Sequence, residues 1–198
     1  MISRNFIAKT LAFVVASLCV YTAYIYNQEQ VFRVSGNIFG SSYNIVSSTY
    51  INDQVHQSIK DELDRIDLIA SNYKNNSELS SINQAGINKS IYISNDLRKI
   101  IESSIKFNKI SNGAFDVTLG NTINQLGFGP EIYLNQKDKV TDFQEKFTLD
   151  DNMFLKHEYF LLDLSAIAKG YAVDKIADLL DQLNFNNYFI DIGGEVIV

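Results

Sequence analysis

Cysteine is almost absent from this chain, and its one copy, Cys19, lies inside an apolar N-terminal run. A single cysteine excludes an intrachain disulfide and excludes a cysteine cluster for zinc or iron–sulfur. The remainder of the chain is free of thiols, which is compatible with an oxidising compartment without proving one. Repeats, coiled coils and long low-complexity segments are absent as well, so the chain is not a repeat or fibrous protein.

The chain also lacks an excess of positive charge, because 17 Lys and Arg residues stand against 23 Asp and Glu residues. A net charge of −6 gives no basic field to hold a phosphate backbone, so nucleic acid is excluded as a partner. The hydrophobic content of 46% and the charged content of 20% are ordinary for a globular protein. Without the first 26 residues, ~170 residues remain, which is the size of one domain.

The N-terminus has the pattern of a targeting segment. Arg4 and Lys9 precede an apolar run over 11–26, as in a signal peptide or a membrane anchor. A small-x-small cleavage site is absent, and Leu18 is bulky for lipoprotein processing at Cys19. We therefore favour an uncleaved anchor over cleavage or lipidation. A helix buried in the core is the competing interpretation. We therefore expect residues 1–26 to hold the protein in the inner membrane with residues 31–198 facing the periplasm.

The first half of the soluble part predicts a hairpin followed by helices. Residues 31–49 alternate apolar and polar positions around two glycines, which favours short antiparallel strands. Apolar residues at helical spacing over 55–73, ending with Tyr73, predict an amphipathic helix. We expect a polar loop over 74–86, a brief strand over 91–93, and a helix capped by Ser94 or Asn95 that ends at Asn112-Gly113, with Gly113 at the C′ position.

The second half predicts mixed structure. Residues 135–147 are charged and read as an exposed loop that follows Pro130, the only proline. The apolar run over 159–164 predicts a buried strand, 168–183 a helix, and 188–192 a further strand that turns at two glycines into a partner strand. Together these elements predict an α+β domain with a largely antiparallel sheet and interspersed helices. The last strand has nothing to cover its edge, so we expect C-terminal sequence to be missing and the sheet to be incomplete.

The junction between residues 162 and 170 favours an anionic ligand. A strand breaks at small residues and leads into a helix that carries Lys169. The first N–H groups of a helix lack partners inside the helix and lie at the positive end of its dipole, so a phosphate finds donors there. An ordinary strand-to-helix junction with a solvated lysine is the competing interpretation, and it is weakened by three further motifs.

Four motifs stand in order along the chain: FGSSYNI (39–45), GAFDVTLG (113–120) with LGFGP after it, LDLSAIAKGYAVD (162–174) and DIGGEV (191–196). Together they resemble the ApbE family of FAD:protein FMN transferases, and the SELSSIN segment also fits. The resemblance covers about residues 32–198, nearly all of the part outside the targeting segment, and it agrees with an α+β fold. Any one of these motifs alone would carry little weight.

The resemblance implies roles for particular residues. Phe39 would lie beside bound FAD, with Tyr73 as an aromatic wall. The adenosine part would be held by Ala114, Phe115 and Asp116. Further FAD contacts would come from Asp163 and Lys169, and the backbone carbonyl of Ala166 would help to coordinate Mg²⁺. These roles suit the chemistry, since aromatic faces stack on ring systems, carboxylates accept hydrogen bonds from hydroxyls or amines, and an ammonium offsets phosphate charge.

Structural roles compete with these assignments at several positions. Tyr73 would close the apolar face of the first helix if it does not contact the ligand, and Asp116 would cap a turn. Asp163 requires a partner among the leucines around it, which a ligand, a metal shell or backbone amides could supply. Gly193 and Gly194 fit positive φ angles in a hairpin turn. For Glu195, a structural role and a functional role both stay open.

The reaction that the resemblance implies moves the FMN part of FAD to a Ser or Thr hydroxyl of an acceptor flavoprotein and releases AMP, with Mg²⁺. The family's remaining metal ligands and its His-x-x-Asp-Pro region follow the GGE motif, and neither His56 nor His157 matches that histidine; we expect both at the surface. Two other functions stay open for the chain, which could be an inactive fragment: a non-catalytic FAD-binding or vestigial product of an interrupted gene, and an FAD pyrophosphatase.

Overall fold

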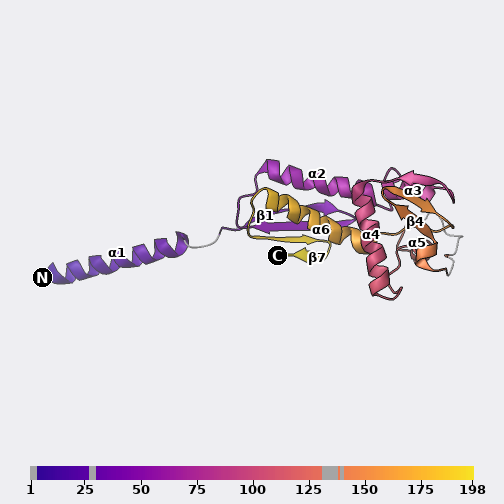
Figure 1. Ribbon diagram of the computed structural model, residues 1–198. Coiled ribbons are helices and arrows are strands. Elements are labelled where there is room, and N and C mark those ends of the chain that lie inside the picture. Colours follow the sequence, from indigo (N-terminus) through magenta and orange to yellow (C-terminus); the bar gives the residue numbers. More distant parts are fainter. Residues whose placement is uncertain (1–3, 27–29, 131–137, 139–140) are drawn as a thin grey trace.

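The computed structural model describes residues 4–26, 30–130, 138 and 141–198. The N-terminal segment forms one helix, α1 (Arg4–Tyr26), which Figure 1 draws apart from the rest of the chain. From Ala8 to Tyr26 this helix is apolar and long enough to cross a membrane, a property that signal sequences share. The length and composition of the helix agree with the predicted targeting segment, and its role, cleavage and lipidation stay predictions.

A four-stranded antiparallel sheet, sheet A, forms the first lobe. Its strands β1 (Phe32–Ile38), β2 (Ser41–Ser47), β6 (Tyr188–Ile192) and β7 (Glu195–Ile197) lie in the order β1-β2-β6-β7. Each of the two hairpins closes through a two-residue turn, Phe39-Gly40 between β1 and β2 and Gly193-Gly194 between β6 and β7. Both hairpins were predicted from the glycines and the alternating pattern, and both glycines of the second turn have positive φ as expected.

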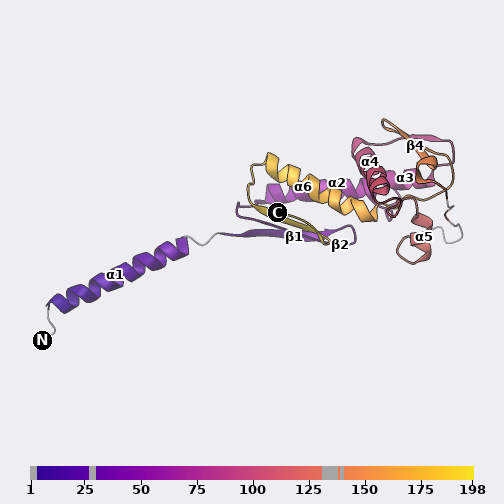
Figure 2. The same ribbon diagram turned by 60° about the horizontal axis from the view of Figure 1, so that its bottom comes forward.

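Two helices cover one face of sheet A, as Figure 2 shows. They are α2 (Asp53–Ala70), which Asn52 caps through its side chain, and α6 (Ser165–Gln182). The apolar face of α2 buries the residues that the helical spacing selects, Ile59, Leu63, Ile66 and Ile69. The first three pack with α6 and the inner face of the sheet into one hydrophobic core, while Ile69 packs into a second core. Tyr73 lies beyond the end of α2, so the interpretation that it completes this face is wrong.

The second lobe surrounds a smaller sheet. Strands β3 (Ser90–Tyr92), β5 (Met153–Lys156) and β4 (Phe147–Asp150) lie in the order β3-β5-β4 and are all antiparallel. They pack in a second core with α3 (Glu78–Gln84) and α4 (Asn95–Ile110), while α5 (Gly120–Gln125) lies at the same end of the molecule (Figure 1). The observed architecture is α+β with antiparallel sheets and interspersed helices, as predicted.

The helix α4 confirms its expected start, because Ser94 accepts a hydrogen bond from the Leu97 amide at 3.2 Å. Its end differs by one residue from the prediction. Asn112 takes the left-handed conformation with φ +53, and the Gly113 amide donates to the Asn108 carbonyl at 2.8 Å. This pattern places Asn112 at C′ and Gly113 at C″, since asparagine also tolerates positive φ.

The polar loop predicted over 74–86 is wrong, because its second half is the helix α3. Ser77 caps this helix by accepting from the Ser80 amide at 2.9 Å, and Leu79 and Ile82 are fully buried beneath it. The segment is short and mostly polar, so the two apolar residues three positions apart were the only periodic signal.

The strand predicted over 159–164 is also wrong, although the segment is buried and extended. On one side it forms an isolated parallel bridge between Leu161 and Leu119, with main-chain hydrogen bonds from Gly120 to the Leu161 carbonyl at 3.0 Å and from Asp163 to the Val117 carbonyl at 2.8 Å. On the other side the Asn83 carboxamide replaces a strand, since it accepts from the Leu162 amide at 2.7 Å and donates to the Leu162 carbonyl at 3.0 Å. The backbone is therefore paired without a neighbouring strand.

Residues 135–137 and 139–140 of the exposed loop predicted over 135–147 lie outside the described residues. The described end of this loop is a 3-10 turn, η2 (Phe143–Glu145), that leads into β4. Phe143, Lys146 and Phe147 are buried there, so exposure is wrong for these three residues, whereas residues 141, 142, 144 and 145 are exposed as expected. The two phenylalanines belong to the second core, and Lys146 finds polar partners inside it.

Candidate active site: a cavity at one end of sheet A

One end of sheet A gathers parts that are distant in the sequence. Antiparallel pairing of Tyr43 with Ile192 brings the turns of both hairpins to the same end. The segment after α2 and the first turns of α6 reach this end as well, and together with the Phe39-Gly40 turn they enclose a cavity of about 530 Å³. This volume is in the range of small-molecule sites.

Phe39 forms one wall of this cavity from an unusual backbone conformation. It has φ +52 at the first position of its turn, and Gly40 follows with φ +68. Positive φ at both residues defines a type I′ turn, which Asn-Gly fits best and which strains a bulky residue. Phe39 is partly buried against the first core. Strain of this kind clusters at ligand sites, which agrees with the expected role beside FAD.

Tyr73 lines the same cavity from the segment after α2. Its ring is 66% exposed, and its hydroxyl donates to the Phe128 carbonyl at 2.7 Å. Phe128 also lines the cavity and is 74% exposed. Two exposed rings in one cavity offer faces on which a flat aromatic ligand can stack.

Lys169 reaches the cavity from α6, together with Ser165 and Ala168. The helix begins at Ser165 rather than at the predicted residue 168, so Lys169 lies in its second turn. The Lys169 ammonium lies 3.5 Å from the Gly193 carbonyl, which connects α6 to the second hairpin turn. The turn approaches closely, because a Cβ at Gly193 would stand 3.1 Å from the Lys169 side chain.

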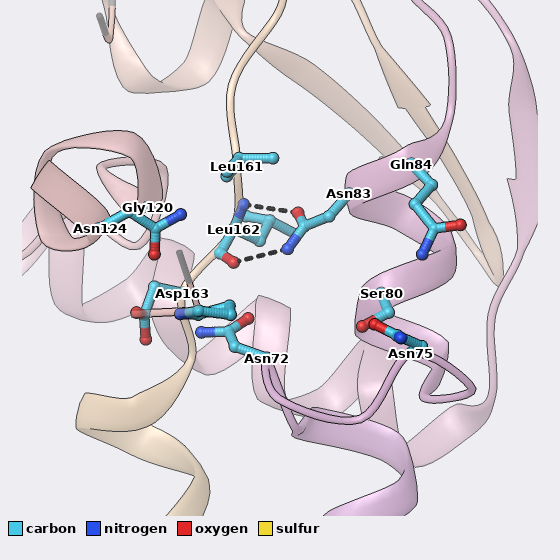
Figure 3. A pocket seen from close by; sticks show the side chains of 11 residues that line it. Asn72, Asn75, Ser80, Asn83, Gln84, Gly120, Asn124, Leu161, Leu162 and Asp163 are labelled. Atoms are coloured by element: carbon cyan, nitrogen blue, oxygen red, sulfur yellow. Dashed lines mark hydrogen bonds between the residues drawn. The ribbon is translucent and has the colours of Figure 1, made fainter. Parts of the chain in front are cut away.

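The helix start is partly occupied by Asp163. Its Oδ1 accepts from the Ser165 amide at 2.8 Å, so the partner that this carboxylate requires is a backbone amide. Asp163 lines a small cavity of about 30 Å³, among carboxamides that include Asn72 and Asn124 (Figure 3). Asn72 lines both this small cavity and the larger one, so the two are adjacent.

The residues 114–116 are not among those that line the larger cavity. Ala114 is exposed, and the Phe115 ring packs 5.9 Å from Phe107. Oδ1 of Asp116 accepts from the Thr118 amide at 2.7 Å and from the Thr118 hydroxyl at 2.6 Å. Asp116 therefore makes the turn contacts of the competing structural interpretation, and its contact with adenosine stays a prediction.

A buried lysine completes the surroundings of Asp116. Lys146 is 2% exposed, with its ammonium 2.8 Å from the Thr118 hydroxyl and 3.6 Å from Asp116 Oδ2. An enclosed ammonium must be paired, so Asp116 holds a structural charge whether or not it also contacts a ligand.

Ala166, the expected metal ligand, is exposed and faces a different hollow between α4, α6 and β7. Among the described residues, no group of three or more His, Cys, Asp and Glu side chains is arranged to hold a metal ion. Mg²⁺ requires several oxygen ligands. Coordination of Mg²⁺ by the Ala166 carbonyl therefore stays a prediction.

Tyr171, in the motif that carries Lys169, links three helices. Its hydroxyl donates to Asp96 on α4, and Arg65 on α2 donates to the same carboxylate. Burial would raise the pKa of Asp96, but the hydrogen bonds from Tyr171 and Arg65 outweigh it and lower that pKa. Burial and the Asp96 charge raise the pKa of Tyr171. This cluster fixes α6, and with it the position of Lys169.

The histidines differ from each other. His157 is exposed as expected. His56 is partly buried, and its Nε2 lies 3.0 Å from the Tyr43 hydroxyl, so it is only partly at the surface.

Sequence reasoning missed an ion pair in the cavity wall. Asp67 and Lys74 line the cavity and lie 2.6 Å apart, and neither belongs to a motif. The available signal was a carboxylate between Ile66 and Ile69, next to the buried face of an amphipathic helix.

The fold and the cavity define an α+β domain suited to a ligand with aromatic rings and negative charge. The sequence model of the ApbE family matches residues 39–198, and the chain belongs to this family. The FAD:protein FMN transferase of Haemophilus influenzae is 36% identical over 85% of this chain and 54% of its own length. This membership confirms the family resemblance drawn from the four motifs.

Solved structures agree with the fold. The flavin transferase ApbE from Vibrio cholerae superposes with a TM-score of 0.75 at 30% identity, covering 84% of this chain and 58% of that one. The ApbE protein of Thermotoga maritima gives a TM-score of 0.71 at 26% identity. The chain thus spans about half the length of the curated relatives it matches.

Proposed function

We propose that this chain carries the flavin-recognition part of an FAD:protein FMN transferase. The observation that carries the proposal is the cavity at the end of sheet A, where Phe39, Tyr73 and Lys169 meet although 130 positions separate the first and last of them (39 and 169). Membership in the ApbE family supports it, since the similar curated proteins bear this name.

In this proposal the aromatic residues bind the flavin rings, and Lys169 offsets the charge of the diphosphate. The hydroxyl oxygen of a Ser or Thr on an acceptor flavoprotein attacks the phosphorus of the FMN half. The hydroxyl loses its proton to the solvent, a phosphoester bond forms, the bond between the two phosphates breaks, and AMP leaves. Negative charge grows on the leaving phosphate during this step, so a fixed cation nearby would lower the barrier.

Mg²⁺ dependence belongs to the same proposal and rests on the family relationship alone. The described residues supply no carboxylate cluster for the ion. We therefore assign no step of the reaction to it. A loss of turnover with EDTA that added Mg²⁺ restores would support the dependence.

The proposal is tested by incubating the purified full chain with FAD, Mg²⁺ and an acceptor protein that carries a Ser or Thr flavinylation site. Covalent flavin on the acceptor, seen by mass spectrometry, supports the transferase. FMN and AMP without covalent flavin indicate a pyrophosphatase, and saturable FAD binding without turnover indicates a non-catalytic binding protein. Absence of saturable binding contradicts flavin recognition altogether.

We further propose that α1 anchors the domain in the inner membrane, with the cavity facing the periplasm. The apolar run of Ala8–Tyr26 supports this placement. Fractionation of a tagged protein, followed by protease treatment of spheroplasts, tests it. A tag that stays protected in the cytoplasm would contradict it.

A further inference from the structure

The cavity wall contains the ion pair between Lys74 and Asp67. Nζ of Lys74 lies 2.6 Å from Oδ2 of Asp67, and the two side chains are 39% and 12% exposed. Both residues line the same cavity as Lys169. Asp67 projects from the last turn of α2, while Lys74 belongs to the segment that leads into α3.

The backbone of Lys74 is held firmly. Its carbonyl accepts from the Ser77 amide at 3.0 Å and from the Ser80 hydroxyl at 2.8 Å. The Ser77 hydroxyl in turn donates to the Ser71 carbonyl at 2.6 Å, which closes the loop around Tyr73. The ammonium of Lys74 is thus presented from a fixed main chain, and a donor held in this way loses little freedom when it binds a ligand.

The charged residues of the lining sum to a net positive charge, which favours an anionic ligand. Lys74 and Lys169 contribute two positive charges, and Asp67 supplies the one carboxylate among the described residues that line the cavity. An ammonium has three N–H donors. With one directed at Asp67, Lys74 keeps donors for an anion. A diphosphate carries two negative charges, one for each lysine.

We propose that Lys74 is a second cation for the diphosphate of FAD, in the lining of the same cavity as Lys169, and that Asp67 is a positioning residue that holds the Lys74 ammonium in the wall. The inference rests on the proposed function and names a binding residue outside the family motifs. Asp67 also lowers the net positive charge of the cavity. The cavity therefore attracts the anion less strongly than Lys74 and Lys169 would without this carboxylate.

A purely structural role for the pair makes different predictions. If the ion pair only connected α2 to the following segment, removing it would move the cavity wall. The affinity for every ligand of the cavity would then change by the same factor. Contact with the diphosphate affects only ligands that carry phosphate. FAD and riboflavin distinguish the two roles, since riboflavin has the same rings and no phosphate.

The experiment is a titration of FAD and of riboflavin with the full chain in detergent, followed by flavin fluorescence. We expect Lys74→Met to weaken FAD binding by about tenfold, as for a lost charge-assisted hydrogen bond, and to change riboflavin binding by less than about twofold. Lys74→Arg should keep most of the FAD affinity because it keeps the charge. Lys60→Met, which removes an exposed lysine of α2, serves as the control for net charge.

A change at Asp67 should alter FAD affinity in the opposite direction. Asp67→Asn keeps the size of the side chain and an oxygen for the Lys74 ammonium, but it removes the negative charge. We expect FAD to bind about threefold more tightly and riboflavin to bind as before, since attraction between unlike charges rises when the competing carboxylate is removed. Circular dichroism and the melting temperature of each variant establish that it is folded.

The inference is overturned if Lys74→Met binds FAD as tightly as the wild type, or if either variant changes FAD and riboflavin affinity by the same factor. A loss of FAD affinity in Lys74→Arg equal to that in Lys74→Met also overturns it. If wild-type protein binds neither ligand, the proposed function and this inference fall together. If wild-type protein binds both and the variants do not discriminate, only the inference falls.

Discussion

Lysines near carboxylates occur in both lobes, but their surroundings differ. In the second lobe Lys146 is 2% exposed and enclosed by Thr118 and Asp116. At the end of sheet A, Lys74 is 39% exposed, and it faces a cavity of about 530 Å³ that Lys169 also lines. The comparison teaches that open space beside the ammonium, rather than the type of residue or its partner, separates a structural lysine from one that can bind a ligand.

The largest effect should come from removing the carboxylate of Asp116, which is paired with the enclosed Lys146. We expect Asp116→Ala to lower the free energy of unfolding by about 3 kcal/mol, because it leaves the buried Lys146 unpaired and the Thr118 amide without its acceptor. Urea denaturation measures this loss. Asp61→Ala, which removes an exposed carboxylate of α2, is the control and should cost less than about 0.5 kcal/mol. Unchanged stability together with weaker FAD binding would instead group Asp116 with the cavity residues.

The next effect concerns a second enclosed lysine, Lys156, which is 1% exposed and donates to the Ile82 and Asn83 carbonyls at the end of α3. Burial lowers the pKa of Lys156 from 10.5 to about 8. Between pH 8 and pH 10.5 the unfolded chain therefore binds more protons than the folded chain, and stability rises with pH. We expect a gain of about 1.5 kcal/mol between roughly pH 8 and pH 9.5.

Urea denaturation across this range, for the wild type and for Lys156→Met, isolates the contribution. The variant cannot titrate at this position, so its stability should rise less with pH than that of the wild type. Parallel curves for the two proteins would mean that Lys156 keeps an ordinary pKa in the folded state.

On the open side of the comparison, we expect Lys169→Met to weaken FAD binding about tenfold, which corresponds to about 1.4 kcal/mol. Its effect on unfolding should stay below about 0.5 kcal/mol, because the one hydrogen bond it loses is a long contact of 3.5 Å with the Gly193 carbonyl. Isothermal titration and thermal melting measure the two quantities. A large loss of stability without a loss of affinity would place Lys169 with Lys146 as a structural lysine.

The smallest expected effect concerns Phe39, in the hairpin turn that borders the cavity. We expect Phe39→Asn to raise the free energy of unfolding by about 0.5 kcal/mol, because asparagine adopts positive φ with less strain, and to weaken FAD binding about threefold through the lost ring. Phe39→Leu removes the ring without favouring positive φ, so it should weaken binding without any gain in stability. Equal stability of the two variants would show that the turn is not strained.

Local patterns in the sequence were sufficient for much of the fold. Helical spacing predicted α2 and α4, Ser94 predicted the cap of α4, and glycines predicted both hairpins of sheet A. These features depend on neighbours within a few positions, so one sequence reveals them. The helix α3 and the hairpin of β4 and β5 were missed, because each is short and is stabilised by the second core rather than by its own pattern.

The candidate site was predicted in part. Phe39, Tyr73 and Lys169 were identified through the family motifs, and the structure places them in one cavity. Asp67 and Lys74 were missed, since their pairing depends on how the chain turns after α2. Burial of Lys146 could not be predicted either, because the residues around it read as a charged loop until the second core is assembled.

Asn83 has a consequence for how the two lobes are connected. Its carboxamide satisfies both main-chain groups of Leu162, which lies three residues before α6 (Figure 3). A ladder of strands opens only by breaking several bonds in sequence, whereas this contact is released by rotation of a single side chain. The path from the second lobe into the lysine-bearing helix is nevertheless clamped on both sides, because the Gly120 amide donates to the Leu161 carbonyl at 3.0 Å and the Asp163 amide donates to the Val117 carbonyl at 2.8 Å, so a change of Asn83 frees one side only.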